Sequence, residues 1–194
     1  MKKVLLLGDS IRMGYQAYVR DLLREEYEVI FPEDNGRFAA YTLWQGNQMF
    51  KHNEDIALVH WNNGYWDMNI EPPMTEPIHS LAEYTGYLRR ITALIRACGA
   101  KVVFATTVPV LEQEAARRMP GVQRETNYDN QWVKTYNQAA TELMKELSVP
   151  VNDLYALCAQ DPFCYKCSDL LHLTEQGYRR CAEQIADVIR NELA

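Results

Sequence analysis

Short runs of apolar residues alternate along the chain with longer segments in which apolar residues recur every three or four positions. The apolar runs predict five β-strands, at residues 4–7, 27–31, 55–61, 101–108 and 149–152. The helical spacing predicts amphipathic helices at about residues 11–22, 41–50, 81–95, 132–147 and 174–189. Strands that alternate with helices in this way predict one parallel sheet with helices on both faces.

No linker, repeat or low-complexity stretch interrupts the alternation. Residues 1–194 are therefore expected to form a single α/β domain, a three-layer α/β/α sandwich around a five-stranded parallel sheet. The apolar share of 47% and the charged share of 24% exclude disordered and collagen-like classes. A net charge of −6 argues against nucleic acid or an anionic membrane as the main partner.

The N-terminus carries only four apolar residues between Lys3 and Gly8, which is too short for a secretory signal. No stretch of the sequence approaches the length of a membrane span. We therefore expect a cytoplasmic protein without a membrane partner. The sequence leaves the oligomeric state open.

The turn after the first strand carries the first candidate for chemistry. Gly8 ends the apolar run and is followed at once by Asp9, Ser10 and the first amphipathic helix. Ligands of open α/β sheets bind at the carboxyl ends of the strands, and a helix N-terminus there favours an oxyanion. Position alone leaves two readings of Ser10 open, because serine is also a preferred helix N-cap. Asp9 is expected to be a turn residue that hydrogen-bonds nearby backbone.

A second candidate, Asp169-Leu-Leu-His172, stands just before the last helix. In one turn of helix-like backbone, residues three apart face the same side, so Asp169 can fix the tautomer of the His172 imidazole. The free imidazole nitrogen would then be available to Ser10. The three side chains would supply a nucleophile, a general base and an orienting acid.

Gly8-Asp9-Ser10 after the first strand, with Asp169-x-x-His172 before the last helix, resembles the SGNH/GDSL hydrolase superfamily of esterases and lipases. The resemblance implies the flavodoxin-like SGNH hydrolase fold, with Ser10 as nucleophile and the Asp169 and His172 side chains completing the triad. It also implies an oxyanion hole formed by the N–H of Ser10, the N–H of Gly36 and an asparagine side chain. The Gly-x-Ser-x-Gly elbow of α/β-hydrolases is absent.

The third sequence block departs from the family pattern. The family has Gly-x-Asn-Asp after the third strand, whereas this chain has tryptophan at the asparagine position of Gly64-Tyr-Trp-Asp67. Asn63, with Asn62 as the alternative, is expected to supply the missing amide. Asp9, Tyr65 and Trp66 are candidate substrate contacts, although aromatic residues beside a pocket more often serve packing.

A structural or solvent-exposed position is the first expectation for the remaining histidines and cysteines. His60 lies within a strand and is expected to be structural, whereas His52 and His79 are expected to be solvated. Cys158, Cys164 and Cys167 are close together, and free thiols, a disulfide and a metal site all remain open. The proposed chemistry needs no metal or organic cofactor. Cys98 and Cys181 lie on apolar helix faces and are expected in the core.

The resemblance implies hydrolysis of a carboxylic ester through an acyl-serine intermediate. Short acyl groups, especially acetyl on a carbohydrate, are the first expectation, so the partner would be a small-molecule or carbohydrate ester. Two alternatives stay open. The same triad could transfer the acyl group to an alcohol, or the tryptophan in the third block could mark a ligand-binding member with a degraded oxyanion hole.

Overall fold

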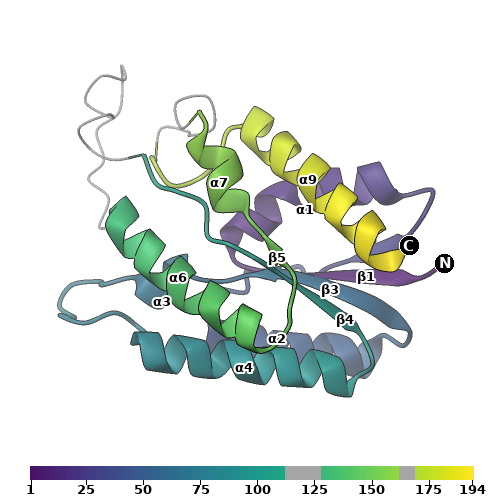
Figure 1. Ribbon diagram of the computed structural model, residues 1–194, viewed down its shortest axis with the longest axis horizontal. Coiled ribbons are helices and arrows are strands. Elements are labelled where there is room, and N and C mark those ends of the chain that lie inside the picture. Colours follow the sequence, from purple (N-terminus) through teal and green to yellow (C-terminus); the bar gives the residue numbers. More distant parts are fainter. Residues whose placement is uncertain (112–127, 162–168) are drawn as a thin grey trace.

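The computed structural model describes residues 1–111, 128–161 and 169–194 (Figure 1). Five parallel strands form one sheet in the order β2-β1-β3-β4-β5. Their bounds are β1 Lys3–Gly8, β2 Glu28–Ile30, β3 Ile56–Asn62, β4 Lys101–Ala105 and β5 Val151–Asn152. The predicted α/β class and its five-stranded parallel sheet are confirmed.

Helices cover both faces of the sheet. α1 and α9 pack against each other on one face, with α7 beside α9, whereas α2, α4 and α6 cover the other face (Figure 1). The helix bounds are α1 Ser10–Leu23, α2 Ala39–His52, α3 Tyr65–Met68, α4 Leu81–Ala97, α6 Asn130–Glu146, α7 Leu154–Ala159 and α9 Glu175–Leu193. The first and last long helices therefore lie side by side, and this brings the two ends of the chain together.

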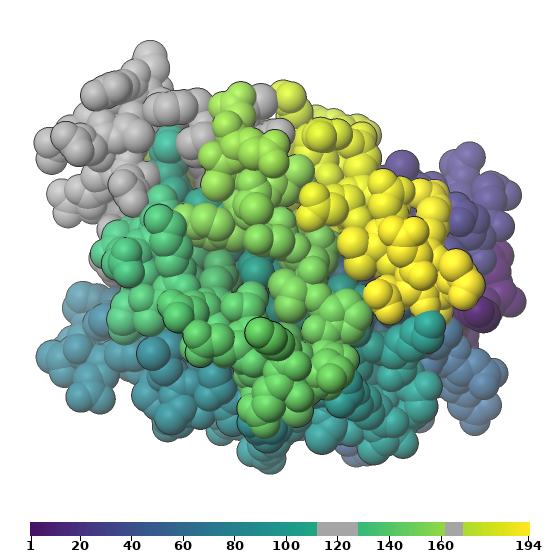
Figure 2. All heavy atoms as spheres, viewed as in Figure 1, coloured from purple at the N-terminus to yellow at the C-terminus, as the bar shows by residue number. Residues whose placement is uncertain are grey.

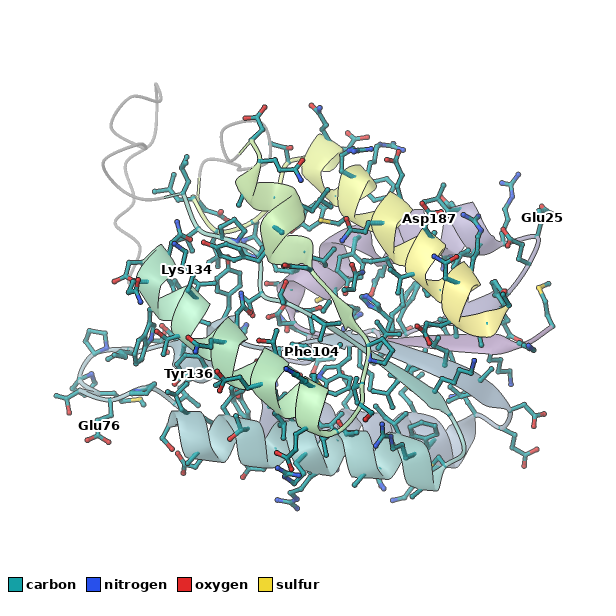
Figure 3. The ribbon with its side chains drawn as sticks, viewed as in Figure 1. Glu25, Glu76, Phe104, Lys134, Tyr136 and Asp187 are labelled. Atoms are coloured by element: carbon teal, nitrogen blue, oxygen red, sulfur yellow. The ribbon has the colours of Figure 1, made fainter. Side chains whose placement is uncertain are left out.

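The core lies between these layers. The side chains of β1 from Val4 to Leu7 are fully buried, as a central parallel strand requires. Figure 3 shows Phe104 of β4 in the interior, where its ring packs edge-on against Trp61 at 5.2 Å between centroids. In the same view the charged side chains project outward; the labelled ones are Glu25, Glu76, Lys134 and Asp187. Figure 2 shows that α6, α7 and α9 together form much of one face of the molecule.

The structure differs from the sequence expectation at several points. α3 and α7 were not expected, because four and six residues are too short to show helical periodicity. β4 ends at Ala105 rather than near residue 108, since its partners β3 and β5 end at Asn62 and Asn152, which flank Ala105. The loop expected from residue 112 to 129 lies mostly outside the described residues.

The cysteines divide into three groups. Cys158 and Cys181 are buried, with their Sγ atoms 3.7 Å apart, which is too far for a disulfide bond between them. Cys98 was expected in the core but is exposed, because it is the C-terminal cap of α4 rather than part of its apolar face. Cys164 and Cys167 lie outside the described residues.

None of the helices in the described ranges combines the length and apolar character needed to cross a membrane.

Candidate active site

Three neighbouring strands end in one row at the carboxyl edge of the sheet. Gly8 of β1 pairs with Asn62 of β3, and Asn62 pairs with Ala105 of β4. Ser10 follows this row as the first residue of α1. Because α9 packs along α1, the segment that precedes α9 reaches the same edge.

Ser10, His172 and Asp169 form a continuous chain of close polar contacts at this edge. The Oγ of Ser10 lies 2.8 Å from Nε2 of His172. The Nδ1 of the same imidazole lies 2.6 Å from Oδ2 of Asp169. The His172 and Asp169 side chains are 36% and 32% exposed, so the group is open to molecules in solution.

Asp9, not Ser10, is the N-cap of α1. The N–H of Ile11 donates to Oδ1 of Asp9 at 2.9 Å, which satisfies one of the donors that a helix start leaves unpaired. Ser10 is therefore not the helix cap, and its hydroxyl faces His172 instead.

A tight turn holds Asp169 and His172 together. Oδ1 of Asp169 accepts from the backbone N–H groups of Leu171 and His172 at 2.9 and 2.8 Å. The sequence predicts a helix-like turn here, but the structure differs. Buried Leu170 has a left-handed backbone with φ of 66°. A leucine in this region is strained by roughly 1–3 kcal/mol. The Leu170 carbonyl, which accepts from the N–H of Leu111 at 2.9 Å, helps to fix it.

A buried polar chain lies beside Ser10. Oδ1 of Asp9 accepts from Nδ2 of Asn62 at 2.8 Å, and Oδ1 of Asn62 accepts from the hydroxyl of Tyr15 at 2.9 Å. Oδ2 of Asp9 is buried without a partner. Burial raises the pKa of the Asp9 carboxyl from 3.8 to about 6, although its hydrogen bonds from Asn62 and Ile11 act in the opposite direction.

Gly36, Asn62 and Asn63, three of the residues expected to supply oxyanion-hole donors, have other partners. The N–H of Gly36 donates to the Gly8 carbonyl at 2.9 Å. Nδ2 of Asn63 donates to both the Arg37 carbonyl and Oγ1 of Thr42, each at 3.0 Å, which uses both of its hydrogens. The one partner shown for Nδ2 of Asn62 is Asp9, and this contact uses a single hydrogen.

The two aromatic candidates differ in placement. Tyr65 is 2% exposed and its hydroxyl donates to the Val108 carbonyl, so its ring belongs to the core. Trp66 is partly exposed at the third sequence block. Of these two side chains, Trp66 is the one that remains accessible to a ligand.

Sequence reasoning missed a second Asp–His pair. Nδ1 of His79 lies 2.7 Å from Oδ1 of Asp67, and the Asp67 carboxylate also accepts from the N–H of Ala39. The expectation that His79 is solvated is wrong, because its side chain is only 12% exposed. The 12-residue spacing matches no helix or strand period, so the sequence held no signal for this contact.

The expectation of a structural His60 agrees with its surroundings. The imidazole is fully buried, and this burial lowers its pKa to about 3. Its Nε2 contacts the amide of Asn152 at 3.1 Å.

A buried arginine beside the site was also missed. Arg12 donates to the carbonyls of Pro32 and Asp34 at 2.8 and 2.7 Å, and so ties the segment before Gly36 to α1. A signal was present in the sequence, because Arg12 lies three positions before Tyr15 and seven before Val19, on the apolar stripe of α1.

The parallel sheet, with a serine after the first strand and an Asp–His pair before the last helix, defines a three-layer α/β protein of the hydrolase type. The GDSL-like lipase/acylhydrolase family model matches residues 6–180. The chain therefore belongs to this family, and that membership supports an ester hydrolase.

Individual relatives agree with this assignment. The chain is 28% identical over 114 residues to the GDSL esterase/lipase WDL1 of Oryza sativa subsp. japonica, covering 57% of this chain and 44% of that protein. It is 27% identical over 185 residues to the GDSL esterase/lipase CPRD49 of Arabidopsis thaliana, covering 94% of this chain and 67% of that protein. The match thus spans less than half the length of the first relative.

A solved structure shares the fold. An acetyl-xylooligosaccharide esterase from Geobacillus superimposes with a TM-score of 0.75 at 17% sequence identity, covering 97% of this chain and 94% of the other. The likeness concerns the arrangement of the sheet and helices. It extends over nearly all of both chains.

Proposed function

We propose that residues 1–194 act as one serine esterase domain, which hydrolyses a carboxylic ester through an acyl-serine intermediate. The observation that carries the proposal is the contact of 2.8 Å between Ser10 Oγ and His172 Nε2. Asp169 supports it, because its contact with Nδ1 selects the tautomer in which Nε2 is free to accept a proton.

The reaction follows from these positions. Nε2 of His172 accepts the Ser10 proton while Oγ forms a bond to the ester carbonyl carbon. Collapse of the tetrahedral intermediate breaks the bond to the alkoxy oxygen, and His172 returns the proton to the leaving alcohol. Water then attacks the acyl-serine with His172 again as base, which releases the acid and restores the Ser10 hydroxyl.

The negative charge of the tetrahedral intermediate needs hydrogen-bond donors. Ser10 N–H lies in the first turn of α1, where N–H groups have no acceptor within the helix. Asn62 is the better amide candidate, since a single one of its two amide hydrogens is used by Asp9, whereas Asn63 uses both. Gly36 would first have to give up its hydrogen bond to Gly8.

An acetyl group on a carbohydrate is the substrate class we propose. The fold that the chain shares with an acetyl-xylooligosaccharide esterase supports this choice. So does the exposure of the Asp169 and His172 side chains, because a bulky alcohol can approach a site that is open to solution.

The first test is hydrolysis of short p-nitrophenyl esters by the wild type and by Ser10→Ala, at folding matched by circular dichroism. We expect wild-type activity to fall by at least roughly 10³-fold in Ser10→Ala. A phosphonate that modifies serine nucleophiles should add its mass to the peptide containing Ser10. Equal activity of the two proteins would overturn the proposal.

The engaged amides of Gly36 and Asn63 favour one second candidate, a ligand-binding protein without turnover. It predicts no hydrolysis of p-nitrophenyl esters or acetylated sugars and no labelling of Ser10. Acyl transfer is tested in the same assay, by adding an acceptor alcohol and measuring the ester formed against the acid released.

A further inference from the structure

An exposed stack of three side chains lies at the beginning of α2. The guanidinium carbon of Arg37 is 4.9 Å from the centre of the Tyr41 ring, and the Tyr41 and Trp44 rings are stacked at 5.5 Å and 27°. Trp44 is 55% exposed. One end of this Arg37–Tyr41–Trp44 stack is therefore an accessible flat indole.

The stack is fixed by hydrogen bonds. The hydroxyl of Tyr41 donates to Oδ2 of Asp34 at 2.8 Å. The Asp34 carbonyl is itself held by the buried Arg12 and by Nε2 of Gln45, at 2.7 and 3.0 Å. The central ring cannot leave its place without breaking the contact to Asp34, so the ring on which the indole stacks is held in place before any ligand binds.

The stack begins next to the candidate active site. Gly36, which precedes Arg37, donates to the carbonyl of Gly8, two residues before Ser10. The Arg37 carbonyl accepts from Asn63 at 3.0 Å. Trp44 is five residues beyond the start of α2 at Ala39, which places it roughly 8 Å farther along the helix axis.

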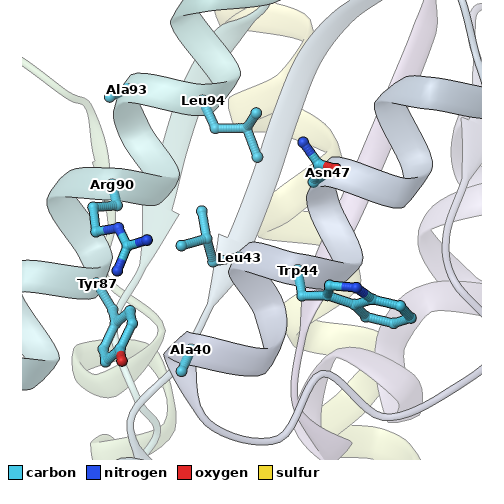
Figure 4. A pocket seen from close by; sticks show the side chains of 8 residues that line it. All are labelled: Ala40, Leu43, Trp44, Asn47, Tyr87, Arg90, Ala93 and Leu94. Carbon is cyan, nitrogen blue, oxygen red and sulfur yellow. The ribbon is translucent and has the colours of Figure 1, made fainter.

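Trp44 also borders a groove of about 670 Å³ between α2 and α4. Figure 4 shows Leu43 and Leu94 between the two helices, with Tyr87 and Arg90 on α4, and with Trp44 and Asn47 on α2. The lining combines apolar and aromatic surface with a few polar groups that can fix a ligand's orientation. A sugar ring presents the matching chemistry, since its C–H face is apolar and its hydroxyls donate and accept.

The distribution of exposed large apolar side chains argues against a protein or a lipid as the occupant. Among the described residues, Trp44 is the only aromatic one of the strongly exposed large apolar side chains, and none of the others lies on α2 or α4. A protein or membrane surface would need a contiguous apolar patch. An aromatic face with Asn47 and Arg90 in the same groove fits a polyhydroxylated chain better.

We propose that the Arg37–Tyr41–Trp44 stack and the adjoining α2–α4 groove form a subsite for the sugar chain of an acetylated oligosaccharide. The subsite rests on the proposed function, because it would hold the glycan while an acetyl ester on a neighbouring sugar reaches Ser10. Trp44 stacks on a sugar ring, and Asn47 and Arg90 hydrogen-bond its hydroxyls.

The kinetic test compares an acetylated xylo-oligosaccharide with p-nitrophenyl acetate, which is too small to reach the subsite. Trp44→Ala should lower the ratio of kcat/KM for the oligosaccharide to that for p-nitrophenyl acetate by roughly 5- to 10-fold, mainly through KM. Leu22→Ala is the matched control, since Leu22 is 43% exposed on α1, on the other face of the sheet, and it should leave the ratio unchanged. An unchanged ratio in Trp44→Ala would overturn the subsite.

A binding test separates the subsite from the proposed hydrolysis. Deacetylated xylo-oligosaccharide is titrated by calorimetry into Ser10→Ala and into Ser10→Ala combined with Trp44→Ala. Binding that needs Trp44 supports the subsite even if the wild type hydrolyses no ester. Hydrolysis of p-nitrophenyl acetate by the wild type without any oligosaccharide binding would leave the esterase standing and reject the subsite.

Discussion

Within the described residues, two Asp–His pairs have nearly the same contact distance and different surroundings. Asp169 and His172 are joined through Nδ1 at 2.6 Å and are about one-third exposed. Asp67 and His79 are joined through Nδ1 at 2.7 Å, but the carboxylate is fully buried and the imidazole is 12% exposed. The contact between carboxylate and imidazole therefore does not by itself distinguish the two pairs.

The two imidazole rings differ in what they contact besides the carboxylate. Nε2 of His172 faces the hydroxyl of Ser10 at 2.8 Å. The ring of His79 is instead packed between aromatic rings, edge-on to Phe38 at 5.5 Å and against Tyr87 at 4.9 Å. We infer that the first pair moves protons and that the second pair holds the start of α2 to the loop before α4.

A histidine-to-asparagine substitution in each pair tests this difference most directly, and the largest effect is expected at His172. The amide nitrogen of an asparagine can take the place of Nδ1, so His172→Asn keeps the contact to Asp169 but has no atom to reach Ser10. We expect kcat/KM on p-nitrophenyl acetate to fall by roughly 10⁴- to 10⁶-fold. The free energy of unfolding in urea should change by less than about 1 kcal/mol, because the pair is solvent-accessible.

Addition of free imidazole is the control for this variant. If only the missing base limits the reaction, imidazole should restore part of the activity of His172→Asn and none of that of Ser10→Ala. Near wild-type activity in His172→Asn would remove the distinction between the two pairs.

Asp9 offers a third case, because it is a buried carboxylate without a histidine partner. Its folded-state pKa of about 6 lies above the ordinary value of 3.8, so the folded protein holds this proton more tightly than the unfolded chain does. The resulting stabilisation is complete below pH 3.8 and is lost as pH rises through about 6. The change amounts to about 3 kcal/mol.

Asp9→Asn isolates this contribution, since the amide cannot ionise but can still accept from Ile11. Urea unfolding of both proteins at several pH values between 3.5 and 7.5 measures it. The free energy of unfolding of the wild type minus that of Asp9→Asn should decrease by about 3 kcal/mol as pH rises over this range. A difference that is independent of pH would contradict the raised pKa.

Much of the fold could be predicted, because each long element carries its own periodic signal. The buried part of β1 from Val4 to Leu7 is a continuous apolar run, and α9 places its buried residues three and four apart. Short elements such as α3 carry no such signal. The ends of β4 depend on where β3 and β5 stop, which is information held elsewhere in the chain.

The site divides in the same way. Asp169 and His172 are close in sequence, and Ser10 follows a recognisable strand, so their approach was predictable from local patterns and sheet topology. The Asp67–His79 contact and the partners of Asn62 and Asn63 were not. They depend on which of several nearby carbonyl and hydroxyl groups each side chain meets after packing, and sequence spacing does not encode that choice.

The smallest effect is expected from His79→Asn, the counterpart of the first substitution. The asparagine keeps a donor for Asp67, so the buried carboxylate and its bond from Ala39 stay satisfied, and only the ring contacts with Phe38 and Tyr87 are lost. We expect the free energy of unfolding to fall by about 1–2 kcal/mol, with kcat/KM on p-nitrophenyl acetate within roughly 3-fold of wild type. Urea unfolding and the same ester assay measure both quantities. A loss of activity as large as that of His172→Asn, at unchanged stability, would mean that the buried pair takes part in the chemistry. A loss of stability alone would mean that the same two residue types, when buried, stabilise the fold and do not act in the reaction.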